Sequence, residues 1–196
     1  MSIIEEIKKL ESAKDSIYGT SYRGAAILKD GTEIPCLIFK SKEKIVNLAK
    51  RRIKEELNGN GCLGGDDPFG QIVTVFAAGG NRVNDYDISK VIPSKYAIPD
   101  SLRSKIRGET FMGWTGWGFE MNDGKLFQFG SSFSFDYFDM PEGYEFSDVK
   151  TVHNHSYLNG AGELCKLRQG AFPPEEYKRE NVYREKVSFE CAIDGI

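Results

Sequence analysis

The sequence lacks features that would place the protein in a membrane or outside the cell. It has no apolar run close to the roughly 20 residues that a membrane-spanning helix needs. Its opening stretch, MSIIEEIKKL, carries too many charges and too short an apolar run for a signal peptide. We therefore expect a cytoplasmic protein that has no membrane partner.

Cysteine is scarce and widely scattered. The four cysteines are at positions 36, 62, 165 and 191, with no CxxC pair. This spacing indicates neither a zinc ribbon nor a dense disulfide framework. We expect reduced thiols, most of them buried.

The chain also lacks an excess of positive charge, since its net charge is -3. A nucleic-acid binder that neutralises many phosphates is therefore disfavoured. The basic residues in KSKEKIVNLAKRRIKEEL are interleaved with glutamates, which is typical of a solvated helix face. A net acidic chain instead favours a basic protein partner.

The sequence contains the GxGxxG pattern of dinucleotide-binding proteins, but not the order of strand and helix that this pattern needs. The stretch GNGCLG, residues 59–64, spells GxGxxG, but that fingerprint requires a strand before it and a helix after it. Here the predicted order is reversed, and two aspartates follow where a phosphate would sit. We expect a helix-to-strand loop and no bound dinucleotide.

The composition predicts a globular fold rich in sheet. Hydrophobic residues make up 40% and charged residues 28%, with 13 Phe and 9 Tyr against 2 Trp, and such aromatic content suits strands. Hairpin turns outnumber helical crossovers, which disfavours a parallel α/β fold. We expect a single α+β domain over 1–196, built on a curved, mainly antiparallel sheet of about six to eight strands with two principal helices.

Local signals place the elements along the chain. Ser2 and Glu5 form a capping box, Asp30-Gly31 is a hairpin signal, and Ser41 caps a helix. Pro35 cannot donate to a ladder, so its strand should lie at an edge or carry a bulge there. The expected elements are a helix over 2–14, a hairpin over 22–39, a helix over 42–58, a loop-rich connection over 79–99 that leads to a short helix at 100–107, and a sheet-rich part over 109–193.

A second hairpin is expected at Asn122-Asp123-Gly124. A two-residue loop at Asp123-Gly124 would place two sets of apolar side chains on opposite faces of the sheet. The first set is Trp117, Phe119 and Met121, and the second is Phe127 and Phe129. Gly116 and Gly118 would then leave room for the second set.

Both histidines of the chain lie in VHNHSYLNGAGELC, residues 152–165. On one strand His153 and His155 would share a face and could bind one metal, with Glu163 or Cys165 as a further ligand. Without metal, the two could act as an acid/base pair. The competing interpretation is that both histidines are structural.

Aromatic residues supply the candidate binding surface. Trp114 and Trp117 lie in a glycine-rich stretch and could anchor a partner, and Tyr157 shares the predicted histidine face. The aromatic residues at odd positions from Phe127 to Tyr137 favour core packing over a ligand-stacking platform. Burial of the tryptophans in the fold is the alternative.

These observations favour a non-catalytic binding protein. We expect a cytoplasmic binding or inhibitor protein, for which the immunity-protein type would fit, that recognises a protein partner through an acidic surface and aromatic loops. The sequence itself requires no cofactor, and it does not reveal whether one is bound. The alternative is a hydrolase that uses His153 and His155, with or without a divalent metal.

Overall fold

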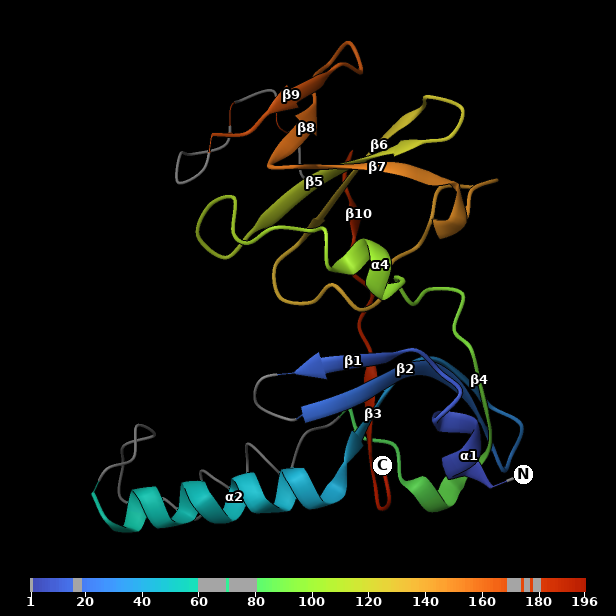
Figure 1. Cartoon of the computed structure of the whole chain (residues 1–196), viewed down its shortest axis with the longest axis vertical. Coiled ribbons are helices and arrows are strands. Elements are labelled where there is room, and N and C mark those ends of the chain that lie inside the picture. The colour runs from blue at the N-terminus through green and yellow to red at the C-terminus, as the bar shows by residue number, and fades with distance from the viewer. Residues whose placement is uncertain are drawn as a thin grey trace. The chain divides into compact units, whose positions relative to one another are not determined.

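The α+β fold class is confirmed. The computed structural model describes residues 2–15, 19–59, 70, 81–168, 174, 177 and 181–196, and Figure 1 shows their helices and strands. Among these residues, the strand pairs are antiparallel except for two parallel pairs, β3–β11 and β6–β10. The structure differs from the expected single sheet, because the described strands form sheets of five, four and two.

The contacts group the chain into two compact units. Unit 1 comprises Met1–Lys95 with Ser188–Ile196, and unit 2 comprises Tyr96–Val187. No change in composition marks this division in the sequence. Whether the chain folds as a single domain stays a prediction.

In the described residues, unit 1 contains a five-stranded sheet and the helices α1 and α2. The strand order is β1-β2-β3-β11, and β4 also pairs with β2. Ile7, Leu37, Phe39 and Cys191 are fully buried in its core. The elements of unit 1 are α1 (Ile3–Ile7), β1 (Ser12–Asp15), β2 (Gly19–Leu28), β3 (Glu33–Ser41), α2 (Lys42–Leu57), a 3-10 turn (Asp85–Asp87), β4 (Ile88–Ile92) and β11 (Phe189–Ile193).

The two principal helices begin where the caps predict. Ser2 and Glu5 form the capping box of α1, but this helix ends at Ile7 and does not reach residue 14. The chain then turns so that Leu10 packs against Gly24, where a Cβ atom would lie 2.6 Å from Leu10 Cδ1. α2 begins after Ser41 and matches the predicted range closely.

The first hairpin confirms two local predictions. Its loop ends at Gly31, which has a φ of 88°, as a residue in this turn position requires. The register of β2 against β3 changes between Gly24 and Ala26. Pro35 and Cys36 together face Ala25 there, which is the bulge expected at a proline.

The region from 79 to 99 is more regular than expected, because β4 lies within it and pairs with β2. The GNGCLG motif after Gly59, Cys62 within it, and the strand expected to follow this loop lie outside the described residues. No helix in the described part of the chain is both long enough and apolar enough to cross a membrane.

Unit 2 contains a four-stranded sheet in the order β10-β6-β5-β7 and a separate β8–β9 hairpin. The predicted short helix near residue 100 is present. The elements of unit 2 are α4 (Asp100–Arg103), β5 (Thr115–Met121), β6 (Leu126–Ser131), a 3-10 turn (Phe146–Asp148), β7 (Val149–Asn154), β8 (Ser156–Leu158), β9 (Leu164–Lys166) and β10 (Tyr183–Arg184).

The β5–β6 hairpin corrects the predicted arrangement of faces. Its loop has three residues, because Met121 N–H donates to the Lys125 carbonyl and Gly124 N–H donates to the Met121 carbonyl. Trp117 therefore pairs with Phe129, and Phe119 pairs with Phe127. Directly paired residues share a face, so all four rings lie together, contrary to the two-residue-loop prediction.

Each face of this sheet packs against a different part of unit 2. The aromatic face packs against Ile98, Leu102 and Ile106, in and near α4. The opposite face carries glycines and contacts β8. At Gly130 an added Cβ would lie 2.2 Å from the Trp114 ring, so the missing side chain makes room for an indole rather than for the phenylalanine rings.

Candidate functional site

The two histidines do not share a strand face. β7 ends at Asn154 and β8 begins at Ser156, while His155 between them has a φ of 49°. This left-handed conformation is uncommon outside glycine, and it turns the chain between the two strands. The premise of one continuous strand through both imidazoles is therefore wrong.

His153 belongs to an ion-pair cluster on the sheet. Its Nε2 lies 3.0 Å from Glu120 Oε2, and Lys150 Nζ lies 2.8 Å from Glu120 Oε1. Hydrogen bonds from Lys150 and then from His153 hold the pKa of the Glu120 carboxyl below its ordinary value. Glu120 therefore stays an anion that pairs with the Lys150 ammonium and holds the His153 ring.

His155 has a different partner. Its Nδ1 lies 3.1 Å from Thr110 Oγ1, and the same hydroxyl oxygen accepts a hydrogen bond from Gly116 N–H. Thr110 is fully buried. His155 thus helps to hold the segment that leads into β5.

The predicted metal ligands are not assembled. Within the described ranges, which include His153, His155, Glu163 and Cys165, no group of three or more His, Cys, Asp or Glu side chains could hold a metal. Glu163 accepts a hydrogen bond from the Asn159 amide in the β8–β9 turn. Cys165 pairs with Tyr157 across this hairpin.

All three of the predicted binding aromatics, Trp114, Trp117 and Tyr157, are buried. Trp117 is fully enclosed by the rings of Phe119, Phe129, Phe135 and Phe138. Tyr157 is buried in a second cluster with Leu167 and Tyr177. Burial leaves neither ring enough surface to contact a partner.

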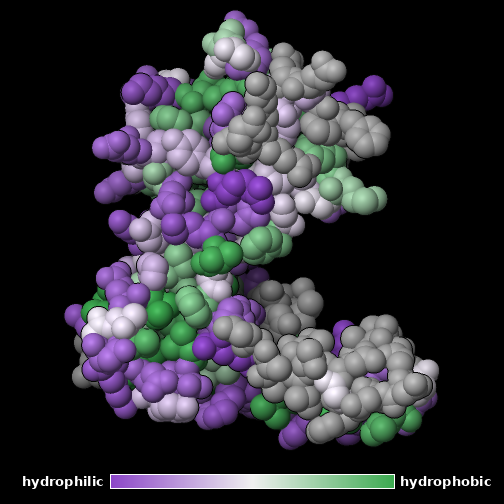
Figure 2. All heavy atoms as spheres, turned by 180° about the vertical axis from the view of Figure 1, so that it is seen from behind, coloured by the Kyte–Doolittle hydropathy of each residue, from purple (hydrophilic) through white to green (hydrophobic). Residues whose placement is uncertain are grey.

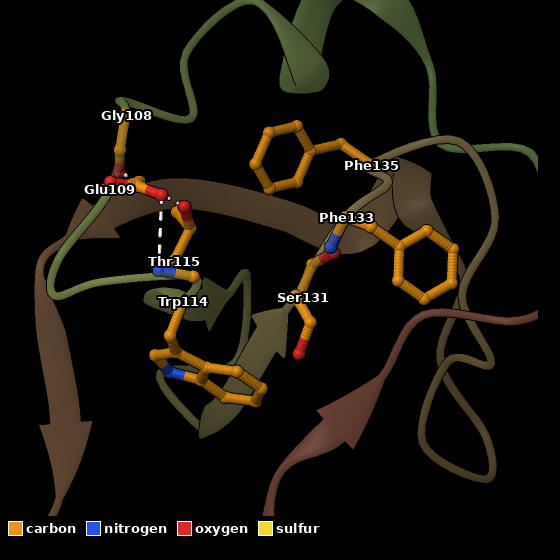
Figure 3. Close-up of a pocket in the computed structure, with 9 residues that line it drawn as sticks. Gly108, Glu109, Trp114, Thr115, Ser131, Phe133 and Phe135 are labelled. Carbon is orange, nitrogen blue, oxygen red and sulfur yellow. Dashed lines mark hydrogen bonds between the residues drawn. The ribbon is translucent and has the colours of Figure 1, made fainter. Parts of the chain in front are cut away.

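Trp114 lies beneath a pocket at the open end of the β5–β6 hairpin. The pocket has a volume of about 230 Å³. In Figure 3, Glu109, Thr115 and Trp114 lie on one side of it, and Ser131, Phe133 and Phe135 lie on the other. The remaining lining residues are Gly108, Gly113 and Ser132.

The 108–115 side of the pocket is held by local hydrogen bonds. Glu109 Oε1 accepts a hydrogen bond of 3.2 Å from Gly113 N–H, and Thr115 Oγ1 donates to the Gly108 carbonyl (Figure 3). Gly113 has a φ of 69°, which a side chain would strain. These bonds hold the Glu109 carboxylate at the edge of the pocket.

The opposite side is organised by Ser131. Its Oγ accepts hydrogen bonds from the N–H groups of Phe133 and Ser134 and donates to the Ser134 carbonyl. The loop that carries Phe133 is therefore ordered even though the Phe133 side chain is exposed. Phe135 packs edge-on against the buried Trp117 ring, with the ring centroids 5.7 Å apart, and this contact fixes its orientation.

An arginine–glutamate pair borders the pocket. The Arg184 guanidinium lies 4.7 Å from the Trp114 ring centroid and donates to Ser132 Oγ and to Glu185. The Glu185 side chain is 2% exposed. Burial opposes its ionisation, but hydrogen bonds from Arg184 and from Ser132 N–H outweigh burial and hold the pKa of Glu185 below its ordinary value.

The arrangement suits binding in a preformed hollow. Of the residues predicted from sequence, only Trp114 lines this pocket, and it forms a buried wall, with its indole N–H donating to Tyr177 Oη at 2.7 Å. Glu109 and Ser131 were not predicted. Phe133 and Phe135 were assigned to the core, and the one signal against this was the interruption of the aromatic pattern at Gly130-Ser131-Ser132.

The fold and the pocket define an α+β protein with a small aromatic pocket on unit 2. Comparisons of the chain with protein-family models, curated proteins and solved structures gave no match. The function is therefore argued from the geometry of the site.

Proposed function

We propose that this is a non-catalytic binding protein that recognises a protein partner through the pocket face of unit 2. The pocket face is defined here as the loop residues 108–115 and 131–135 around the pocket. One observation carries the proposal: apolar side chains are exposed on both loops that frame a preformed pocket. Phe133 is 71% exposed and Met112 is 95% exposed.

Seven large apolar side chains are exposed among the described residues, and two of them, Met112 and Phe133, lie on the pocket face. Figure 2 shows that hydrophilic side chains cover much of the face drawn there, with hydrophobic residues between them. An apolar side chain exposed beside a pocket loses solvent contact when a partner binds, and interface anchors are typically aromatic. A framework already held by hydrogen bonds needs little ordering on binding.

The pocket chemistry favours binding over hydrolysis. Among its described lining residues, Glu109 is the one with a carboxylic acid side chain, and none is a histidine, cysteine or lysine. General acid–base catalysis would need a second group placed within hydrogen-bond reach of a substrate. The finer form of the proposal is a cytoplasmic inhibitor of the immunity-protein type with a basic partner, which the net charge of -3 supports.

The test compares two variants that each remove one exposed apolar side chain. The purified full chain is immobilised at low salt, proteins that it captures are identified, and each is purified and titrated against the chain by calorimetry. Phe133→Ser should weaken binding at least tenfold, while Leu57→Ser on α2, a site 75% exposed, should leave it unchanged.

Two results would contradict the proposal. In one, no purified protein binds with a defined stoichiometry. In the other, Leu57→Ser weakens binding as much as Phe133→Ser does, which would show that exposed apolar area acts without regard to position.

The second candidate is a hydrolase that uses His153, or both histidines. The observation in its favour is the Glu120–His153 contact of 3.0 Å, since a carboxylate commonly orients a catalytic imidazole. Hydrolysis of phosphoester and ester substrates by the full chain, with His153→Ala and His155→Ala as comparisons, tests it. Activity that survives both substitutions would exclude this candidate.

A further inference from the structure

The geometry points to an arginine side chain as the group that the pocket accepts from its partner. This inference rests on the proposed function, because it names the chemistry of the anchor that enters the pocket face. It depends on three properties of the pocket: its volume, its aromatic wall and its carboxylate.

The volume matches a single side chain. Pockets that enclose drug-sized ligands occupy roughly 300–1,000 Å³, and this one has about 230 Å³. The fold leaves the pocket open between the 108–115 and 131–135 loops (Figure 3). A long, narrow side chain from a second protein can enter it.

The aromatic wall favours a flat cation. Phe135 is held in place by its contact with Trp117 and lies across the pocket from Glu109 and Thr115 (Figure 3). Exposed Phe133 extends this wall at the rim. Guanidinium groups stack on aromatic faces and are more weakly hydrated than ammonium groups, so they lose less on leaving water.

The carboxylate and hydroxyls supply acceptors for the guanidinium donors. Glu109 faces this space with its Oε1 already fixed by Gly113 N–H, and a carboxylate can accept several hydrogen bonds at once. The hydroxyls of Thr115 and Ser132 also line the pocket. A guanidinium can donate several hydrogen bonds in one plane to these acceptors, and this property distinguishes arginine from lysine.

The charges beside the pocket permit a cationic guest. Arg184 is the neighbouring cation, but its charge is paired with Glu185 at 3.0 Å. Glu109 places a further carboxylate at the edge of the pocket. Arg184 already makes the two kinds of contact proposed for the guest, because its guanidinium covers the Trp114 ring and donates a hydrogen bond to Ser132 Oγ.

The experiment compares an arginine probe with one probe that matches its shape but not its charge, and with another that matches its charge but not its shape. The ¹⁵N-labelled full chain is titrated with Nα-acetyl-arginine amide, with its neutral isostere Nα-acetyl-citrulline amide, and with Nα-acetyl-lysine amide. The amide signals of Gly113, Thr115 and Ser132 report binding. We expect the arginine probe to bind with a dissociation constant of about millimolar, and both other probes to bind about fivefold more weakly.

Glu109→Gln is the matched variant, because glutamine keeps an oxygen acceptor for Gly113 N–H but removes the charge. It should reduce binding of the arginine probe to the level of the citrulline probe. The inference is overturned if citrulline or lysine amide binds as tightly as arginine amide, if Glu109→Gln changes nothing, or if no probe shifts these signals.

The two proposals fail in different ways. If Phe133→Ser weakens partner binding but Glu109→Gln does not, the pocket face binds the partner without an arginine anchor. If the arginine probe binds while no protein partner does, the pocket chemistry holds and the proposed function fails.

Discussion

Gly130 and Trp114 show how a single missing side chain shapes the site. The indole lies where a Cβ on residue 130 would be, at 2.2 Å from Trp114 Cζ2, and real atoms do not approach so closely. The Trp114 ring can therefore form the buried wall of the pocket while its N–H donates to Tyr177. Glycine is needed at position 130 because it leaves room for the indole ring, and not because the backbone there requires the conformational freedom of glycine.

Replacing Gly130 with alanine should destabilise the fold by about 1–3 kcal/mol, the usual cost of adding a methyl group to a closely packed interior. Denaturant unfolding followed by tryptophan fluorescence measures this change. Gly160→Ala is the control, since nothing lies within 4 Å of its added Cβ. Equal stability of the two variants would show that the Trp114 ring moves without cost.

Cys191 gives a residue-level prediction on pH. Burial, with a smaller contribution from Asp85, raises the pKa of this thiol to about 12 from 9.0. The unfolded chain loses the proton near its ordinary value and the folded chain keeps it, so stability falls as pH rises from 9 towards 12. By pH 10 the loss should be about 1.4 kcal/mol.

The measurement is the free energy of unfolding at pH 7 and pH 10 for the natural chain and for Cys191→Ala. The variant should lose less stability over this interval by about the amount stated. Cys165→Ala, at a partly exposed thiol, is the control variant. An identical pH dependence in all three chains would contradict the assignment.

Residue types alone could not have located the site. Trp114 stood out as a large ring among glycines, and it does line the pocket. Trp117 had the same appearance but packs in the aromatic cluster beside α4, whereas Trp114 is buried in a separate cluster with Phe111 and Tyr177. His155 was misplaced because its left-handed backbone has no marker in the sequence.

At the level of elements, loop length in the β5–β6 hairpin decides which residues meet. Asn-Asp-Gly is compatible with a two-residue or a three-residue loop, and the difference of one residue exchanges the faces of a strand. The three-residue form places Trp117 and Phe119 with Phe127 and Phe129. The same form occurs at Gly31, where Gly31 N–H donates to the Leu28 carbonyl.

Deleting Asn122 should therefore damage the fold far more than Asn122→Ala. The deletion forces a two-residue loop and would expose either the aromatic face or the glycine face of a strand. Circular dichroism and thermal unfolding should show loss of the cooperative transition for the deletion and a change of about 1 kcal/mol or less for the substitution. A cooperative transition in the deletion variant would show that the register is not set by this loop.

Local sequence signals were sufficient for most elements and insufficient for their pairing. Ser2 and Ser41 marked both helix starts, and Pro35 marked its bulge. The end of the predicted sheet-rich part contains two strands, with β10 beside β6 and β11 beside β3. Such parallel pairs join distant segments, and nothing in a short window of sequence specifies them.

At the scale of the whole molecule, the α+β class followed from composition and turn chemistry. The pocket did not, because it depends on two loops brought together by the pairing of Thr115 with Ser131. Both loops are tied by hydrogen bonds from their own side chains. A rigid hollow with exposed apolar residues at its rim is the arrangement on which the proposed function rests.

The most direct test is hydrogen–deuterium exchange of the full chain with and without a purified protein that it captures. The account predicts slower exchange in residues 108–115 and 131–135 on binding, with α2 unchanged. Protection that falls on α2 or on the Glu120–His153 cluster, with the pocket face unaffected, would contradict it.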